Sequence, residues 1–221
     1  MRNSSMICSL LLLVTPAALA TPTVRGTADA RPVERTVAAE ATATAAPGKG
    51  RVFLLVDEAL ALAFPDCEIS RGTVYLTEAQ RGRIEALAGS KLESGIAHPY
   101  VALRGGELVG TAFVDVHKVR TLRETLFVVV SPQGEVKRLE VLAFAEPLDY
   151  LPRGNWYGQF KGKFLNDDLN LDRDIRGVTG ATLTARATTQ AVRRCLALHE
   201  VLSAPPPAHH VSGPQRSDAE Q

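Results

Sequence analysis

The most regular pattern of apolar and polar residues lies near the C-terminus, from about residue 182 to Leu202. Apolar residues recur there every three or four positions, at Leu183, Ala187, Ala191, Cys195, Leu198 and Leu202, with Val192 and Leu196 widening the stripe. The polar residues on the other side of a helical projection are Arg186, Gln190, Arg193 and Glu200. This spacing predicts a long amphipathic helix with one buried face.

Upstream of this helix the apolar residues follow the pattern of strands. Residues 100–103 and 108–116 flank a Gly105-Gly106 pair, which is typical of a tight hairpin. Residues 125–130 and 136–144 flank a second turn, Ser131-Pro-Gln-Gly134. The sequence therefore predicts an α+β fold, in which a twisted antiparallel meander packs with helices as a single domain.

The segment before the meander, residues 51–97, is expected to be a helical extension. An apolar run, Val52–Val56, is compatible with a strand or with the start of a helix. Asp57 is a candidate cap for a helix over residues 58–64, which Pro65 would end. Thr77-Glu-Ala-Gln80 has the form of a capping box and predicts a helix that stops at Gly89.

Both ends of the chain have the composition of segments outside the domain. Arg2, a short apolar run and a small-residue site after Ala20 predict a cleaved signal peptide over residues 1–20, and so export to the periplasm of a bacterium. The apolar run has about 15 residues, fewer than the roughly 20 of a spanning helix, so a retained membrane anchor is the weaker alternative. Residues 21–50 read as a disordered linker and residues 203–221 as a disordered Pro-rich tail.

The charge, cysteine and histidine content gives no sign of nucleic-acid or metal binding. The chain has 25 Lys and Arg against 24 Asp and Glu, and no basic stripe suggests nucleic acid. Cys67 and Cys195 are the cysteines beyond the signal peptide; export permits a disulfide, but Cys195 lies on the apolar stripe and both are expected to be reduced. No histidine has a partner at metal-ligand spacing, and His117 is either a residue near a ligand or a structural histidine.

A glycine- and threonine-rich stretch precedes the C-terminal helix. Gly177 and Gly180 relax the backbone, while Thr179, Thr182 and Thr184 cluster where the helix should begin and can cap its N–H groups. Backbone amides and hydroxyls at a helix N-terminus favour an anion, for instance a phosphate.

The run Thr179-Gly180-Ala181-Thr182, followed by Leu183-Thr184, resembles the [Ser/Thr]-Gly-Ala-Thr signature of FMN-binding domains, as in the C subunit of the sodium-pumping NADH:quinone reductase and the G subunit of the Rnf complex. The resemblance implies that a flavin transferase joins FMN through its phosphate to Thr182. It also implies that the other residues of this run contact the cofactor. Family members usually carry an acid six positions before the modified threonine; here Arg176 stands there, and Asp174 is the candidate for transferase recognition.

Two further segments carry the resemblance, which covers roughly residues 98–202. The strand ending at Glu146-Pro147 resembles the family's Glu-Thr-Pro-Gly corner, which places Glu146 near the flavin. Trp156 and Tyr157 lie in a segment similar to the family's aromatic-Gln-Phe stretch. They either stack on the isoalloxazine ring or dock a surface helix by their aromatic rings.

The resulting expectation is an exported flavoprotein that carries FMN, free in the periplasm or membrane-associated, and passes electrons between a donor and an acceptor at the outer face of the inner membrane. No acid–base set points to an enzyme with its own substrate. Two alternatives stay open. One is a flavin-free exported binding module in which the threonines only cap a helix, and the other is a reductase that binds FMN non-covalently.

Overall fold

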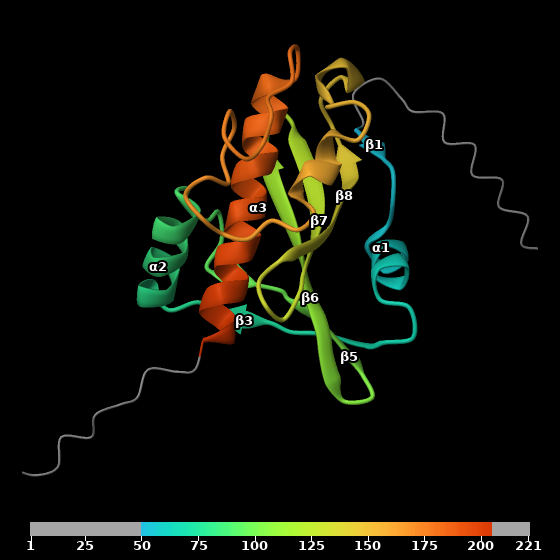
Figure 1. Cartoon of the computed structure of the whole chain (residues 1–221), viewed down its shortest axis with the longest axis vertical. Coiled ribbons are helices and arrows are strands. Elements are labelled where there is room, and N and C mark those ends of the chain that lie inside the picture. The colour runs from blue at the N-terminus through green and yellow to red at the C-terminus, as the bar shows by residue number, and fades with distance from the viewer. Residues whose placement is uncertain (1–49, 205–221) are drawn as a thin grey trace, which may run out of the picture. The chain divides into compact units, whose positions relative to one another are not determined.

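A computed structural model describes residues 50–204, so the predicted signal peptide and nearly all of the predicted linker and tail lie outside the described residues. These residues form an antiparallel six-stranded sheet in the order β1-β8-β7-β6-β5-β2 (Figure 1). Its strands are β1 (Arg51–Val52), β2 (Glu68–Arg71), β5 (Tyr100–Arg104), β6 (Glu107–Lys118), β7 (Arg123–Val130) and β8 (Val136–Phe144). The α+β class predicted from the sequence is confirmed.

The central four strands form the predicted meander. Gly105 and Gly106 connect β5 to β6 with φ angles of 57° and 83°, a left-handed turn that glycine adopts without strain. Along β7, alternate side chains enter opposite faces of the sheet, and both faces are buried. Leu126, Val128 and Val130 belong to one apolar core, whereas Phe127 and Val129 belong to the other.

The segment before the meander contains the two expected helices and also four short strands, so the description of residues 51–97 as a helical extension is incomplete. β1 pairs with β8, and β2 pairs with β5, so this segment supplies both outer strands of the sheet. A small separate ladder joins β3 (Val74–Tyr75) to β4 (Ile96–Ala97). These strands are short, and their partners are distant in sequence, so local pattern gave no signal for them.

The two helices of this segment begin in different ways. α1 (Val56–Ala63) starts after Leu55, whose N–H donates to the Glu58 carboxylate at 2.8 Å. The assignment of Asp57 as the cap is therefore wrong; Asp57 lies in the first turn instead. In α2 (Glu78–Ala88) the predicted capping box is confirmed, because the Thr77 hydroxyl accepts from the Gln80 N–H at 3.2 Å and the Gln80 amide oxygen accepts from the Thr77 N–H at 3.0 Å.

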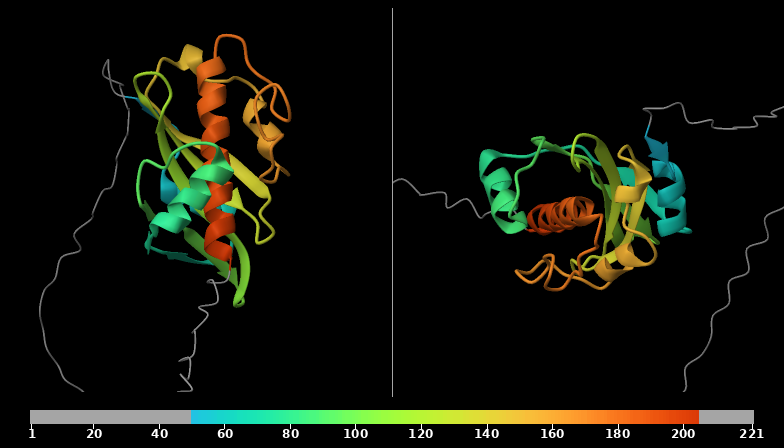
Figure 2. Two further views of the ribbon diagram at one scale, coloured as in Figure 1. Left: turned by 90° about the vertical axis from the view of Figure 1, so that its left-hand side faces the viewer. Right: turned by 90° about the horizontal axis from the view of Figure 1, so that it is seen from above.

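The elements stack in layers, with the sheet between α1 and the long helix α3 (Thr182–Ser203) (Figure 2, right). α3 packs on one face of the sheet through Ala185, Val192 and Leu196. α1 covers the opposite face with Leu60 and Phe64. The predicted long C-terminal helix is confirmed, and its first residue is Thr182 itself.

α2 packs on the side of α3 that faces away from the sheet, and this corrects the sequence-based view of Arg193. The pattern placed Arg193 on the polar side, but its side chain is buried. Its guanidinium donates to carbonyl oxygens of α2 and of the loop before α3, namely those of Leu87, Ala88, Asn166 and Leu169. Helical periodicity identifies one buried face, whereas α3 has two.

Both cysteines of the described part are free, as expected, and Cys195 is buried. No helix within residues 50–204 combines the length and the apolar character needed to cross a bilayer.

Candidate functional site

The N-terminus of α3 leaves its first backbone amides without partners. Gly180 turns the chain into the helix with a φ of 85°, and Ala181 is the N-cap residue. Within residues 50–204, no side chain caps this end, and no acceptor reaches the N–H groups of the first three helical residues, Thr182 to Thr184. Free amides at the positive end of a helix dipole are a favourable environment for an anion.

The threonine hydroxyls do not cap the helix, contrary to expectation. The Thr182 hydroxyl donates to the Val178 carbonyl at 3.1 Å, and the Thr184 hydroxyl donates to the Tyr150 carbonyl at 2.6 Å. Thr184 is buried, whereas Thr182 is exposed. Thr179 is exposed as well and precedes the turn at Gly180. Of the three threonines, Thr182 thus combines solvent access with a position at the first turn of the helix.

Thr182 borders a cavity of about 280 Å³. The signature run supplies one wall, from Gly180 to Thr184, and the other wall comes from Val119, Arg120 and Tyr150. The guanidinium of Arg120 lies over the Tyr150 ring, 5.3 Å from its centroid. Arg120 and the first residues of α3, whose amides are free, therefore border the same cavity as Thr182, which suits a phosphate group attached at or near its hydroxyl.

Glu146 does not line the cavity, but it holds the turn that forms this wall. Its carboxylate accepts the backbone N–H groups of the β6–β7 turn, at 2.7 Å from Thr121, 2.8 Å from Leu122 and 3.3 Å from Arg120. The N–H groups of Leu122 and Thr121, which stabilise the ionised form, hold the pKa of Glu146 below its usual value. The carboxylate thus fixes the turn that carries Arg120 to the cavity.

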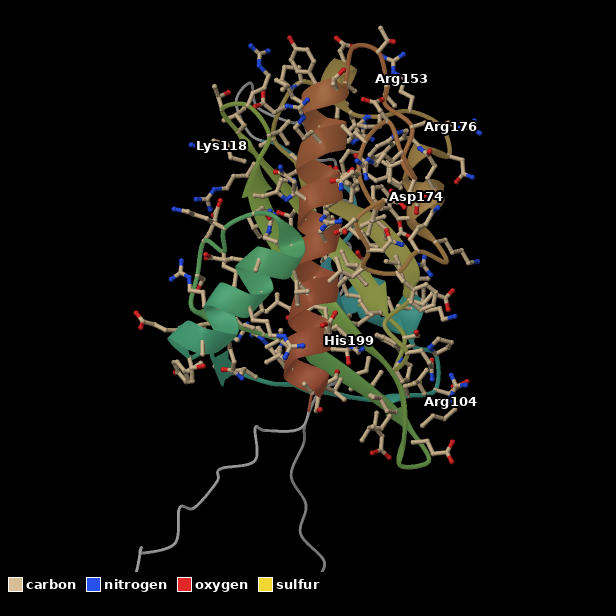
Figure 3. All side chains as sticks on the ribbon, turned by 60° about the vertical axis from the view of Figure 1, so that its left-hand side comes forward. Arg104, Lys118, Arg153, Asp174, Arg176 and His199 are labelled. Carbon is tan, nitrogen blue, oxygen red and sulfur yellow. The ribbon has the colours of Figure 1, made fainter. Side chains whose placement is uncertain are left out.

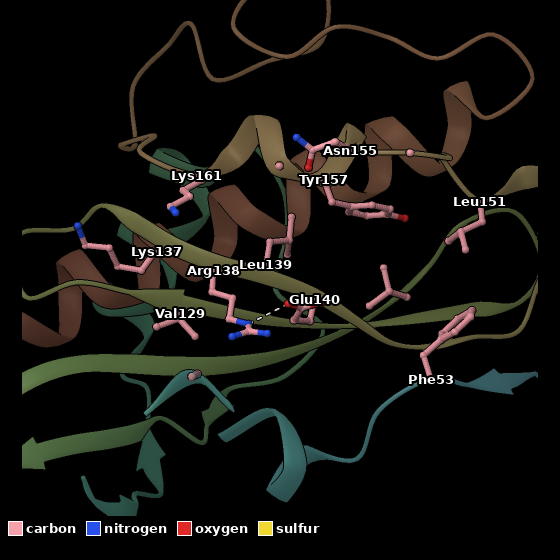
Figure 4. Close-up of a pocket in the computed structure, with 14 residues that line it drawn as sticks. Phe53, Val129, Lys137, Arg138, Leu139, Glu140, Leu151, Asn155, Tyr157 and Lys161 are labelled. Carbon is pink, nitrogen blue, oxygen red and sulfur yellow. Dashed lines mark hydrogen bonds and ion pairs between the residues drawn. The ribbon is translucent and has the colours of Figure 1, made fainter. Parts of the chain in front are cut away.

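Trp156 and Tyr157 lie on a short helix, η2 (Trp156–Phe160), and neither lines the cavity beside Thr182. The indole of Trp156 is buried, and its N–H donates to the Arg176 carbonyl at 2.7 Å. The Tyr157 ring borders a separate and larger cavity of about 740 Å³ (Figure 4). That cavity also contacts Phe53 and the Arg138–Glu140 ion pair, and it includes no residue of the signature run.

The segment from η1 (Leu148–Tyr150) to η2 runs between the two cavities, with Tyr150 bordering the smaller and Leu151 the larger. Asp174 is half-buried and forms an ion pair with Lys163 at 3.1 Å. Arg176, which stands at the position of the family's usual acid, is exposed.

A buried polar network connects α3 to the sheet below the cavity. The Glu124 carboxylate is fully buried and accepts hydrogen bonds from Tyr157 at 3.1 Å and from Thr188 at 3.0 Å. His117 contacts it through Nε2 at 3.1 Å and contacts Asp115 through Nδ1 at 2.9 Å. His117 is thus held between two carboxylates as a structural residue.

The charges in this network set the protonation of its members. Burial opposes the charge on His117, but hydrogen bonds to Asp115 and Glu124 outweigh it and raise the His117 pKa. Burial also opposes ionisation of Asp115, but its hydrogen bonds to His117 and to Arg194, at 2.7 Å, lower its pKa. The Tyr157 pKa is raised by burial and by the charge of Glu124, so the phenol stays protonated and donates.

The fold and this site define a class of protein: an α+β domain whose last helix begins with free amides beside a small cavity, an arrangement that suits the phosphate of a cofactor. Residues 123–197 match the family model of the FMN-binding domain. This part of the chain, which contains β7, β8 and most of α3, is therefore an FMN-binding domain, and FMN is its cofactor. No curated protein matches the chain significantly.

Three residues of the cavity were not identified from the sequence: Val119, Arg120 and Tyr150. Val119 and Arg120 lie just before the segment that matches the family model. They border the same cavity as Thr182 only because the β6–β7 turn lies beside the start of α3, and no local motif marks that proximity.

Proposed function

We propose that this protein is an exported electron-transfer flavoprotein whose FMN is joined by a phosphoester to Thr182. The observation that carries the proposal is the exposed Thr182 side chain at an uncapped helix N-terminus, beside a cavity that Arg120 also faces. FMN supplies the redox chemistry when bound, and the protein supplies attachment, orientation and electrostatics.

The residues around Thr182 would stabilise such an ester in two ways. The free amides of the first turn stabilise the single negative charge of a phosphodiester by about 0.3–1 kcal/mol. The Arg120 guanidinium adds a charge-assisted contact from the opposite wall. A flavin transferase would join the FMN phosphorus to Thr182 Oγ1 while the bond between that phosphorus and the leaving group of an activated FMN donor breaks. The hydroxyl proton would leave with the departing group.

Mass spectrometry of protein co-produced with a flavin transferase tests the ester. The protein should gain the mass of FMN less one water, on the peptide that spans residues 177–186. Thr182→Ala should abolish the gain and keep the fold, because this exposed side chain makes one hydrogen bond. Thr179→Ala is the matched control, since Thr179 is also exposed in the same loop, and it should keep the label.

The result also separates the alternatives. Unchanged labelling of Thr182→Ala would move the ester to another residue. A yellow protein that loses its colour on denaturation would be a non-covalent flavoprotein. A wild-type protein that takes up no flavin under either condition would be a flavin-free binding module.

The proposed location is the periplasm, with a redox donor and acceptor at the outer face of the inner membrane. It rests on the sequence of residues 1–20, which lie outside the described residues. N-terminal sequencing of protein from the periplasmic fraction should begin at Thr21. Recovery of intact Met1 in the membrane fraction would instead establish a retained anchor.

A further inference from the structure

We infer that the end of the domain around Thr182 is a docking surface for an acidic electron-transfer protein, an inference that rests on the proposed function because it takes FMN to be attached there. Five basic side chains surround this end, and we call them the basic collar: Lys118, Arg120, Arg123, Arg176 and Arg186. All five are exposed.

The fold gathers the collar from three segments. Lys118 and Arg123 face each other across the β6–β7 turn, which also carries Arg120 into the wall of the Thr182 cavity. Arg186 lies one helical turn beyond Thr182 on the same face of α3. Lys118 and Arg176 lie at the end of the domain where α3 begins, whereas Arg104 and His199 lie toward the opposite end (Figure 3).

The collar is not neutralised by the protein itself. In the part of the chain that the structure describes, none of the five forms an ion pair. One acid of the adjoining segments, the exposed Asp172, has its carboxylate beside Gly177 and forms no ion pair within residues 50–204, so it offsets one of the five positive charges at most. Four other acids are engaged elsewhere. Glu124 and Glu146 are buried and accept hydrogen bonds, Asp149 pairs with Arg153 at 3.1 Å, and Asp174 pairs with Lys163 at 3.1 Å.

The bound cofactor does not neutralise the collar either. A phosphodiester carries one negative charge, against five positive side chains. The whole chain has a net charge of only +1, so this concentration of charge is a local feature rather than a general basic character. A surface of one sign steers partners of the opposite sign and raises association rates.

The class of partner follows from what the collar surrounds. Electron transfer requires the partner's redox centre to come close to the flavin, and a flavin tethered at Thr182 lies inside the collar. Two exposed leucines, Leu122 and Leu183, which are 42% and 50% exposed, lie among the basic residues. A small apolar area with a charged rim is suited to a transient complex of the kind that redox proteins form.

Electron transfer with two soluble probes of opposite charge tests this inference. Reduced flavodoxin, an acidic protein, would give one electron to the flavin of the loaded protein and be oxidised. Ferric cytochrome c, a basic protein, would take one electron from the reduced loaded protein. Between low and high salt, the stopped-flow rate with flavodoxin should fall by about tenfold or more, whereas the rate with cytochrome c should stay level or rise.

Charge-reversal variants locate the effect on the collar. Lys118→Glu and Arg123→Glu should each lower the low-salt rate with flavodoxin several-fold. Lys91→Glu is the matched control, because Lys91 is also an exposed lysine but lies outside the collar. It follows α2, whose last residue, Ala88, contacts Arg193 in the middle of α3. Arg193 lies eleven residues beyond Thr182 on α3, about 16 Å along the helix axis. This control should change the rate less than twofold.

Binding by the flavin-free chain keeps the two proposals distinguishable. In an NMR titration with flavodoxin, shifts should cluster at residues 118–123 and 183–186 and should disappear in Lys118→Glu. If the protein takes up no FMN yet binds flavodoxin in this way, the electron-transfer role is excluded and the collar remains a surface that binds acidic proteins. If FMN is attached but the rate with flavodoxin changes neither with salt nor with the collar variants, the docking surface is excluded and the proposed function is unaffected. Binding to phosphatidylglycerol vesicles that the same variants abolish would also overturn it, in favour of a lipid surface.

Discussion

The Glu146 carboxylate accepts a hydrogen bond from the backbone N–H of Thr121 at 2.7 Å, although the two residues are 25 positions apart. Glu146 follows β8 by two residues. Through its hydrogen bonds with the backbone of residues 120–122, it holds the β6–β7 turn in place beside α3. The wall of the Thr182 cavity therefore depends on a side chain that does not line it.

We predict that Glu146→Ala lowers the free energy of unfolding by about 2–3 kcal/mol, because it leaves the N–H groups of the turn without their charged acceptor. Glu146→Gln keeps one acceptor oxygen and should cost less. Urea unfolding measures both, and Asp149→Asn, at an exposed position nearby, is the control. A Glu146→Ala protein as stable as the wild type would show that the β6–β7 turn is stable without the Glu146 hydrogen bonds.

The same carboxylate predicts a loss of stability in acid. Its folded pKa lies below the unfolded value of about 4.3, so its contribution is complete above that pH and disappears as the pH falls through the folded pKa. The stability difference between wild type and Glu146→Gln should therefore shrink below about pH 4. Equal differences at pH 7 and pH 3 would contradict this.

His117 predicts the opposite trend at higher pH. Its folded pKa is raised above the unfolded value of about 6.5, so its ionic contribution is present below that pH and is lost as the pH rises through the folded pKa. The stability advantage of wild type over His117→Gln should decrease from about pH 6.5 upward. An NMR titration of the imidazole supplies the folded pKa independently.

Arg193 is expected to be the most sensitive basic residue of α3. Its guanidinium is buried against carbonyl groups of α2 and of the preceding loop, so Arg193→Ala should cost about 3 kcal/mol or more. Arg186→Ala, at an exposed position of the same helix, should stay within about 0.5 kcal/mol. If both variants lose the same free energy of unfolding, helix propensity rather than the buried contacts of Arg193 determines the loss.

The cysteines should differ in reactivity in protein that lacks residues 1–20. Cys67 is partly exposed, whereas Cys195 is buried and burial raises its pKa far above the usual value. A thiol reagent should modify one cysteine in the native protein and two after unfolding in denaturant. Modification of neither after unfolding would indicate a disulfide.

The features predicted correctly from the sequence are those that neighbouring residues determine. The Gly105-Gly106 hairpin, the Thr77–Gln80 capping box and the helix that starts at Thr182 each depend on a few adjacent positions. The predicted capping role of the threonines was wrong, because the Thr182 and Thr184 hydroxyls donate to carbonyl oxygens instead, that of Thr184 to the distant Tyr150.

The missed features depend on contacts between distant segments. Arg193 appeared polar and exposed because the sequence does not show that α2 covers it. Arg120 lies in no recognisable motif, and its place opposite Thr182 follows from the position of the β6–β7 turn beside the start of α3.

The strands before the meander have a consequence for dividing the protein into smaller pieces. β1 and β2 cover the two sides of the meander, and an uncovered strand offers unpaired N–H and C=O groups to any neighbouring chain. The segment that matches the FMN-binding family begins at Arg123, so on its own it would leave β7 without its partner β6 and β8 without β1. A fragment cut to those limits is expected to self-associate through its open edges, whereas one that spans residues 50–204 keeps all the strand pairs that the structure describes.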